Sequence, residues 1–142
     1  MAIKVGDKIP SAAMTVMTED GPGPVATDEF FAGKKVVLFS VPGAFTPTCS
    51  AKHLPGFVTH ADEILAKGVD AIACMSVNDV FVMHAWGKDA GVADKVVMMA
   101  DGNGDFTKAI DLEMDGRGFG MGIRSQRFAM IVENGVVTTL NI

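Results

Sequence analysis

The chain has 142 residues, of which 49% are hydrophobic and 20% are charged, and its formal net charge is −5. This composition is typical of one globular domain over residues 1–142 and excludes an intrinsically disordered chain. The sequence has no basic stripe and no apolar run that is long enough to cross a bilayer, so we expect neither a nucleic-acid partner nor a membrane.

The cysteine content and the first residues predict the compartment. The two cysteines, Cys49 and Cys74, do not have the paired spacing of a disulfide framework, which is typical of a reducing compartment. The first ten residues, MAIKVGDKIP, lack the apolar centre of a signal peptide. We therefore expect a cytoplasmic protein, with an organellar form whose transit peptide has been removed as the alternative.

The first half of the chain alternates between a loop-like segment and apolar runs. Glycine and proline are frequent in residues 18–30, TEDGPGPVATDEF, which predicts a surface connection. Apolar runs rich in β-branched residues follow at 34–41, 69–77 and 95–100. The first two are typical of strands buried on both faces, and the third is a shorter copy.

Helical patterns separate these three runs. In residues 49–68 apolar side chains recur at spacings of three and four, which predicts a helix with one apolar face that ends at Gly68. Residues 79–91, DVFVMHAWGKDAG, predict a second helix with Asn78 or Asp79 as its N-cap. The order strand, helix, strand, helix, strand predicts parallel strands joined by right-handed crossovers.

The end of the chain has a different pattern. Residues 127–142, RFAMIVENGVVTTLNI, are two extended runs joined at Asn134 and Gly135, which is a strong signal for a β-hairpin. A βαβ core followed by an antiparallel hairpin indicates an α/β protein with a thioredoxin-like fold. We therefore expect a central mixed β-sheet flanked by helices, with a C-terminal β-hairpin.

The segment VPGAFTPTCSAKHLPGF, residues 41–57, contains the first cysteine, Cys49, between the first buried strand and the first helix. Thr46 or Thr48 can cap this helix, and Pro47 suits its first positions. Free backbone N–H groups and the positive end of the helix dipole favour a thiolate there. A purely structural cysteine is the alternative, but it does not require a loop fixed by prolines.

Three further patterns bear on cofactors. No cluster of histidine and cysteine has the spacing of metal ligands, so we expect no metal. Gly118, Gly120 and Gly122 imitate a phosphate-binding loop but do not connect a buried strand to a helix, so we expect no nucleotide cofactor. His53, four residues after Cys49, could serve as the base of a Cys–His enzyme, although we prefer a structural role for it.

The motif Pro42-x-x-x-Thr46-x-x-Cys49 resembles the active-site signature of peroxiredoxins. The longer PGAFTPTCSAKHLPGF is similar to the type II (peroxiredoxin-5) branch, and the resemblance extends through residues 74–89 and 118–137 to the closing LNI. It implies a member of the thioredoxin superfamily. The implied activity is thiol-dependent reduction of hydrogen peroxide and alkyl hydroperoxides without a cofactor.

The resemblance also implies roles for four residues. Cys49 would attack the peroxide and become a sulfenic acid, and Thr46 would hydrogen-bond to thiolate and peroxide. Pro42 would shield the sulfenic acid and shape the pocket. Arg127 matches the active-site arginine of the family and would stabilise the thiolate and polarise the O–O bond. Without the resemblance Arg127 would be a surface arginine on a strand, and Arg124 is the weaker candidate for the same role.

The chain departs from the type II pattern at its cysteines and at its end. Many type II proteins carry a resolving cysteine near the C-terminus and continue past the position of Ile142. The sequence therefore predicts that the usual C-terminal extension is missing and that apolar surface is exposed where it would pack. Cys74 matches a cysteine of plant type II proteins and could be the resolving partner, but a thiol buried in the middle of a strand reacts poorly.

A one-cysteine mechanism is therefore the reading we prefer. Glutathione with glutaredoxin, or else thioredoxin, would reduce the oxidised Cys49, and the resemblance implies a homodimer built near the active-site loops. The alternatives are a two-cysteine enzyme with Cys74 as resolver, and a non-catalytic redox sensor or chaperone on the same scaffold.

Overall fold

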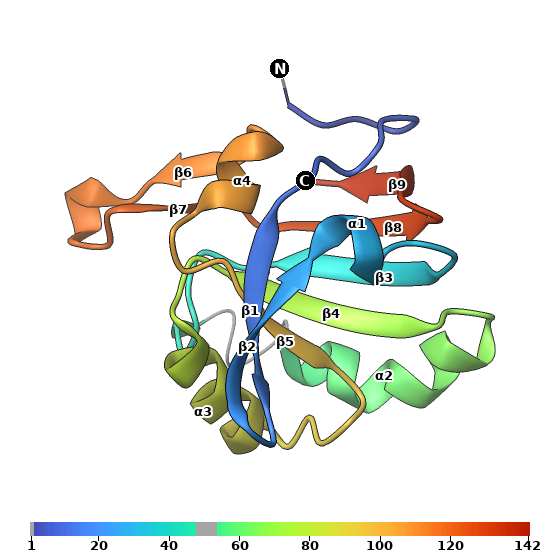
Figure 1. Ribbon diagram of the computed structural model, residues 1–142. Coiled ribbons are helices and arrows are strands. Elements are labelled where there is room, and N and C mark those ends of the chain that lie inside the picture. The colour runs from blue at the N-terminus through green and yellow to red at the C-terminus, as the bar shows by residue number, and fades with distance from the viewer. Residues whose placement is uncertain (1, 48–53) are drawn as a thin grey trace.

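A mixed β-sheet forms the centre of the protein (Figure 1), whose computed structural model describes residues 2–47 and 54–142. The strands of this sheet are β1 (Ala13–Thr18), β2 (Gly21–Ala26), β3 (Lys35–Ser40), β4 (Ala71–Ser76), β5 (Val97–Ala100), β8 (Phe128–Glu133) and β9 (Val136–Asn141). They lie in the order β2-β1-β5-β4-β3-β8-β9. A separate pair, β6 (Glu113–Asp115) and β7 (Ile123–Ser125), forms a hairpin that projects from the sheet.

The three apolar runs of the sequence are the middle strands of this sheet. β3, β4 and β5 are parallel, and their neighbours β1 and β8 are antiparallel to them, so the predicted mixed sheet is confirmed. Successive side chains of β3 enter different cores: Val36 and Leu38 pack on one side of the sheet, and Phe39 packs on the other. This alternation explains why the run is apolar without a period of two.

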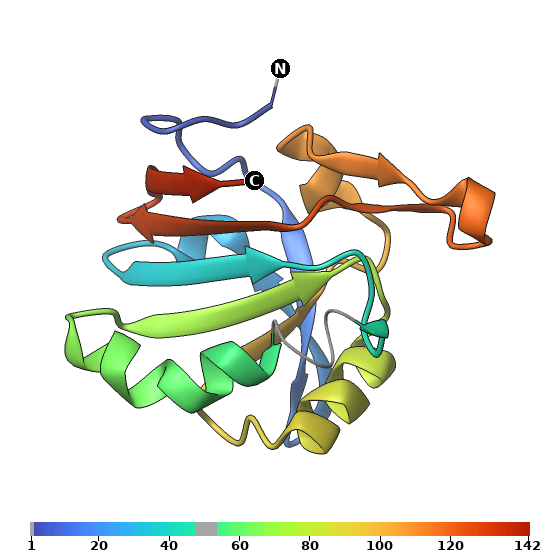
Figure 2. The same ribbon diagram turned by 180° about the vertical axis from the view of Figure 1, so that it is seen from behind.

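Helices cover both faces of the sheet. α2 (Leu54–Ala66) and α3 (Val80–Ala90) lie on one face (Figure 2), where Phe39, Leu54 and Trp86 belong to one buried core. The short helices α1 (Thr27–Phe30) and α4 (Asp105–Ala109) lie on the other face with the N-terminal segment. No helix of the described residues is both long and apolar enough to span a membrane.

The helix ends agree with the sequence prediction. Asp79 is the N-cap of α3, because its Oδ1 accepts a hydrogen bond of 2.9 Å from the backbone N–H of Val82. Gly91 ends α3 with φ of 69°, and Gly68 follows α2 with φ of 89°. Both glycines adopt the left-handed conformation that commonly follows a helix.

The prediction of a surface connection for residues 18–30 is wrong. This segment contains β2, which pairs along its whole length with β1, and also α1. β2 is an edge strand, and Pro22 and Pro24 are compatible with it because a proline needs no hydrogen-bond partner on the outer side of an edge strand. The glycines and prolines therefore mark an edge strand and not a loop.

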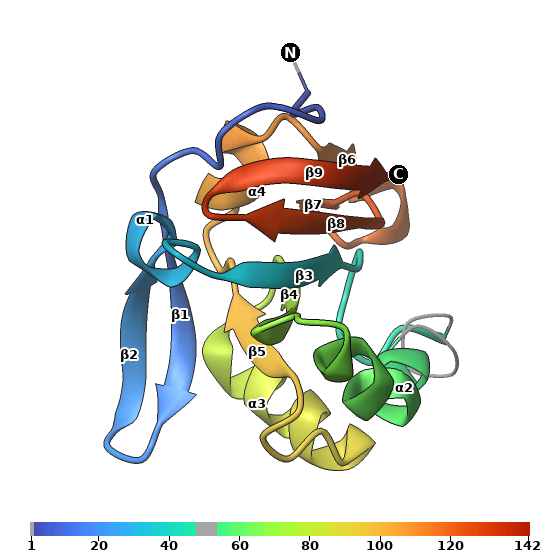
Figure 3. The ribbon, with the colours of Figure 1, turned by 90° about the vertical axis from the view of Figure 1, so that its right-hand side faces the viewer.

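The predicted C-terminal hairpin is confirmed. β8 and β9 pair across the turn at Asn134 and Gly135, which have φ of 48° and 79°. Figure 3 shows these two strands at the end of the sheet that lies away from α2 and α3. Because β8 also pairs with β3, the hairpin brings residues that precede it in the chain to the same edge as the end of β3.

Candidate active site

The loop that follows β3 carries the residues of the predicted signature. Pro42 and Thr46 are described and half-buried, whereas Cys49 and His53 lie outside the described residues. In a parallel sheet the carboxyl ends of the strands share one edge, which is where ligands of open α/β sheets bind. The loop leaves that edge beside the ends of β4 and β5, since the backbone N–H of Val41 donates to the carbonyl of Met75 (3.2 Å).

The loop has a strained and internally bonded backbone. Phe45 has φ of 63°, an uncommon value for a residue other than glycine, and its ring lies 6.4 Å from that of Trp86. The Thr46 hydroxyl donates to the carbonyl of Gly43 at 2.7 Å. A hydroxyl has one proton and two lone pairs, so in this conformation Thr46 is available as an acceptor for a peroxide O–H.

Arg124 of β7 lies against this loop. Its Nε donates to the carbonyl of Met121 (2.8 Å), and its Nη1 donates to the carbonyl of Pro42 (3.4 Å). A Cβ atom on Gly43 would lie 3.2 Å from the same Nη1, closer than an ordinary contact. Gly43 therefore lets the guanidinium approach the loop backbone.

Arg127 reaches the same edge of the sheet by strand pairing. Ser40 of β3 pairs with Phe128 of β8, so the residues just beyond this pair are Val41 and Arg127. From the sequence, Arg127 is the preferred candidate for the active-site arginine and Arg124 is the weaker one. Strand pairing therefore places Arg127 beside the end of β3, where the loop begins, and Arg124 donates a hydrogen bond to the loop itself.

Two buried serines connect β3 to β7 beneath this loop. The hydroxyl of Ser40 donates to that of Ser125 (2.8 Å), which donates to the carbonyl of Gln126 (2.8 Å), and both serines are fully buried. The pair fixes the segment 124–127 against the end of β3. This pair was not predicted from the sequence, although Ser40, the one hydroxyl residue within the apolar run 34–41, was a possible signal.

Cys74 lies far from solvent. It occupies the middle of β4, opposite Phe39 of β3 and Met98 of β5, and it has no exposed surface. The predicted burial of this thiol is therefore confirmed. Attack on a peroxide requires contact with solvent, so Cys74 could react only after the sheet or its covering helices opened.

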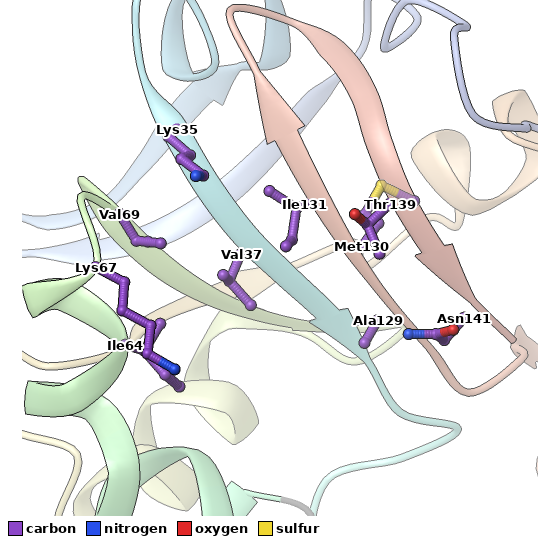
Figure 4. Close-up of a pocket in the computed structure, with 10 residues that line it drawn as sticks. All are labelled: Lys35, Val37, Ile64, Lys67, Val69, Ala129, Met130, Ile131, Thr139 and Asn141. Atoms are coloured by element: carbon purple, nitrogen blue, oxygen red, sulfur yellow. The ribbon is translucent and has the colours of Figure 1, made fainter.

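An apolar groove of about 350 Å³ lies elsewhere, on the face of the sheet between α2 and the C-terminal hairpin (Figure 4). Val37, Ile64 and Ile131 contribute its apolar lining, and lysine, threonine and asparagine side chains stand at its borders. Its lining residues include no histidine, cysteine or carboxylate, so the groove offers no thiol for a reaction with peroxide.

Metal ligands do not cluster in the described part of the chain. Among residues 2–47 and 54–142 no group of three or more histidine, cysteine, aspartate and glutamate side chains could hold a metal ion. His60 and His84 are exposed, and His60 lies 3.6 Å from Glu63 on the surface of α2. The side chains that hydrogen-bond to the described part of the loop are the hydroxyl of Thr46, the amide of Asn78 and the guanidinium of Arg124.

A mixed sheet with three parallel central strands, helices on both faces and an antiparallel C-terminal hairpin is the thioredoxin-like fold. The Redoxin family model matches residues 4–142, and the chain belongs to this family. It is 50% identical to the chloroplastic peroxiredoxin-2E of Arabidopsis thaliana over 99% of its own length. It spans 62% of the length of that relative, and 64% of the related chloroplastic protein of rice.

Solved structures of peroxiredoxins have the same fold. The reduced peroxiredoxin-3 of Vibrio vulnificus in complex with hydrogen peroxide is 56% identical, with a TM-score of 0.95 over 99% of this chain and 87% of that one. The antioxidant protein of Plasmodium falciparum, described as a 1-Cys peroxiredoxin, is 35% identical, with a TM-score of 0.92 over 97% of this chain and 83% of that one. The thioredoxin-like fold and the relationship to peroxiredoxins are therefore both established.

The direction of the buried serine hydrogen bonds gives a prediction about stability. Ser125→Ala removes the acceptor of the Ser40 hydroxyl and should lower the free energy of unfolding by about 1–3 kcal/mol, the cost of an unsatisfied buried donor. Ser40→Ala leaves Ser125 bonded to Gln126 and should cost about 1 kcal/mol or less. Chemical denaturation of both variants measures the difference, and a larger loss in Ser40→Ala would contradict this arrangement.

Proposed function

We propose that this chain is a thiol-dependent peroxidase that reduces hydrogen peroxide and alkyl hydroperoxides through Cys49. The main support is the conformation of the loop after β3, which holds Pro42 and Thr46 at the carboxyl edge of the sheet beside the Arg124 guanidinium. Cys49 follows Thr46 by three positions in the sequence. A cationic side chain near this segment favours the thiolate that the chemistry needs.

The proposed reaction transfers one oxygen atom to sulfur. The Cys49 thiolate attacks the terminal oxygen of the hydroperoxide, so an S–O bond forms while the O–O bond breaks. Sulfur is oxidised by two electrons to a sulfenic acid, and the leaving oxygen takes a proton and departs as water or alcohol. Thr46 accepts a hydrogen bond from the peroxide, and an arginine stabilises the charge that develops along the breaking bond.

An external thiol completes the proposed cycle. It condenses with the sulfenic acid, releases water and forms a mixed disulfide, and a second thiol then restores Cys49 and carries away the disulfide. Glutathione with glutaredoxin, or thioredoxin, would supply these thiols. The complete burial of Cys74 supports this one-cysteine mechanism, as does the similarity to the Plasmodium protein.

We further propose a homodimer and a reducing compartment, in the simplest case the cytoplasm. Phe45, Phe81 and Phe119 are 49%, 64% and 85% exposed. The elements that carry them, the loop after β3, α3 and the β6–β7 hairpin, lie on the same side of the molecule in Figures 1 and 2. Exposed aromatic side chains near a site are typical of a surface that another protein chain covers. The compartment is proposed because the two cysteines of the sequence lack the paired spacing of a disulfide framework.

The proposed activity is tested by steady-state turnover with peroxide and an excess of reductant. Parallel assays use glutaredoxin with glutathione and thioredoxin with its reductase. The wild-type chain should turn over continuously with at least one of them, and Cys49→Ser should be inactive because it lacks the nucleophile. Oxidation that stops after one equivalent of peroxide with both reductants would indicate a redox sensor and contradict a peroxidase.

The two arginines can be distinguished by matched substitutions. We expect Arg127→Gln to lower the rate of the peroxide reaction on the order of 10²-fold, as expected for the loss of one donor that stabilises the transition state. Arg124→Gln removes a 3.4 Å hydrogen bond to the loop backbone and should have the smaller effect. Rapid-mixing kinetics over the same series of peroxide concentrations measures the reaction rate of each variant. A larger loss of rate in Arg124→Gln than in Arg127→Gln would assign the catalytic arginine to Arg124.

The role of Cys74 is tested by mass spectrometry after native thiol blocking. One equivalent of peroxide should leave Cys49 as sulfenic acid, and excess peroxide without reductant should produce sulfinic acid, because no internal thiol intercepts the intermediate. Cys74→Ser should keep near wild-type turnover and lose about 1 kcal/mol of stability from burying a hydroxyl. A rapidly formed disulfide between Cys49 and Cys74, with loss of turnover in Cys74→Ser, would make this a two-cysteine enzyme.

A further inference from the structure

Asn78 lies two residues after the end of β4 and one residue before the N-cap of α3. The sequence predicts either Asn78 or Asp79 as the N-cap of α3, and in the structure Asp79 is the cap. The side chain of Asn78 is therefore free of the helix. It is directed instead to the loop after β3, which is 34 positions away in the chain.

The side-chain oxygen of Asn78 accepts two hydrogen bonds. One comes from the backbone N–H of Ala44 (2.9 Å), in the middle of the loop, and the other from the hydroxyl of Ser76 (2.6 Å). Ser76 is fully buried at the end of β4, and its carbonyl accepts a hydrogen bond from the N–H of Asp101 (3.0 Å). The acceptor that holds Ala44 is thus fixed by the ends of two parallel strands.

This hydrogen bond joins the loop to the sheet at a critical point. Ala44 precedes Phe45, whose positive φ persists only where the surrounding structure holds it. Thr46 follows, and its hydroxyl already bonds to Gly43 within the same turn. The Arg124 bond to Pro42 is longer, at 3.4 Å, so the Asn78 bond is the stronger of these two connections.

We propose that Asn78 is a positioning residue of the peroxidase site, an inference that rests on the proposed function. The hydrogen bond from the Ala44 N–H to Asn78 maintains the positive φ of Phe45, and in this conformation the Thr46 hydroxyl faces the peroxide. Without this bond the Ala44–Phe45 segment relaxes toward a negative φ and displaces the Thr46 hydroxyl. Misplacement of a catalytic group by about 1 Å can cost about 10²-fold in rate.

The test uses variants that separate the acceptor from the volume of the side chain. Asn78→Leu keeps the size and removes the acceptor, whereas Asn78→Asp keeps an oxygen at the same position. Asp79→Ala is the matched control, because it removes the helix cap one residue away without touching the loop. If Asn78→Leu does not fold, Asn78→Ala is used in its place, because alanine introduces no new contacts.

The readout is a ratio of two rates at Cys49. The first is the reaction with hydrogen peroxide, followed by the fluorescence of Trp86, the single tryptophan, whose ring lies 6.4 Å from Phe45. The second is alkylation by iodoacetamide, which reports the amount of thiolate. A charge at position 78 changes both rates together, so the ratio of the peroxide rate to the alkylation rate isolates the positioning of the peroxide.

The ratio should fall about tenfold or more in Asn78→Leu and stay within about threefold of wild type in Asn78→Asp and Asp79→Ala. Thermal unfolding should show a loss of stability in Asp79→Ala without a change in the ratio. An unchanged ratio in folded Asn78→Leu, or an equal fall in Asp79→Ala, would overturn the role of Asn78. A wild-type chain that is alkylated but does not react with peroxide would instead refute the proposed function.

Discussion

The parallel pairing of β3 with β4, buried on both faces, is the constraint on which the rest of the structure depends. It aligns Ser40 with Met75, so the chain leaves both strands at the same edge of the sheet. The loop after β3 and the start of α3 therefore begin side by side, and Asn78 can reach Ala44. A shift of this register by one residue would turn each side chain of β3 to the opposite core and separate these two segments.

Polar groups buried near that edge determine where the later part of the chain attaches. The Ser40–Ser125 bond connects β3 to β7, and the β3–β8 pairing continues the contact toward Arg127. Asp101, after β5, accepts hydrogen bonds from the N–H groups of Phe106 and Thr107 and from the Thr107 hydroxyl. These bonds leave little freedom at the ends of the central strands, and a preorganised site requires this rigidity.

The central elements could be predicted from the sequence because their patterns are local. Continuous apolar runs indicated β3 and β4, and the Asn-Gly pair indicated the hairpin of β8 and β9. The edge strand β2 was missed because its prolines fit a strand only if that strand lies at an edge of the sheet. Whether a strand lies at an edge depends on the order of strands in the folded sheet, which no local pattern shows. The motif after β3 is visible in the sequence, but the hydrogen bonds that hold its described residues are not. The bonds from Asn78 and Arg124 to the loop join residues 34 and 82 positions apart, and no local pattern encodes such distances.

The two edges of the sheet are protected by different means. On β2, Pro22 and Pro24 lack the N–H groups that an added strand would need. On β9, the N-terminal segment covers the first half of the edge through bonds between Gly6 and Val137 and between Ile9 and Gly135. These features hinder the edge strands of two copies from pairing into one continuous sheet. Strand pairing between chains, with which many ordered aggregates begin, is hindered in the same way. A contact between two copies would therefore have to form through side-chain surfaces, whose composition can change one residue at a time.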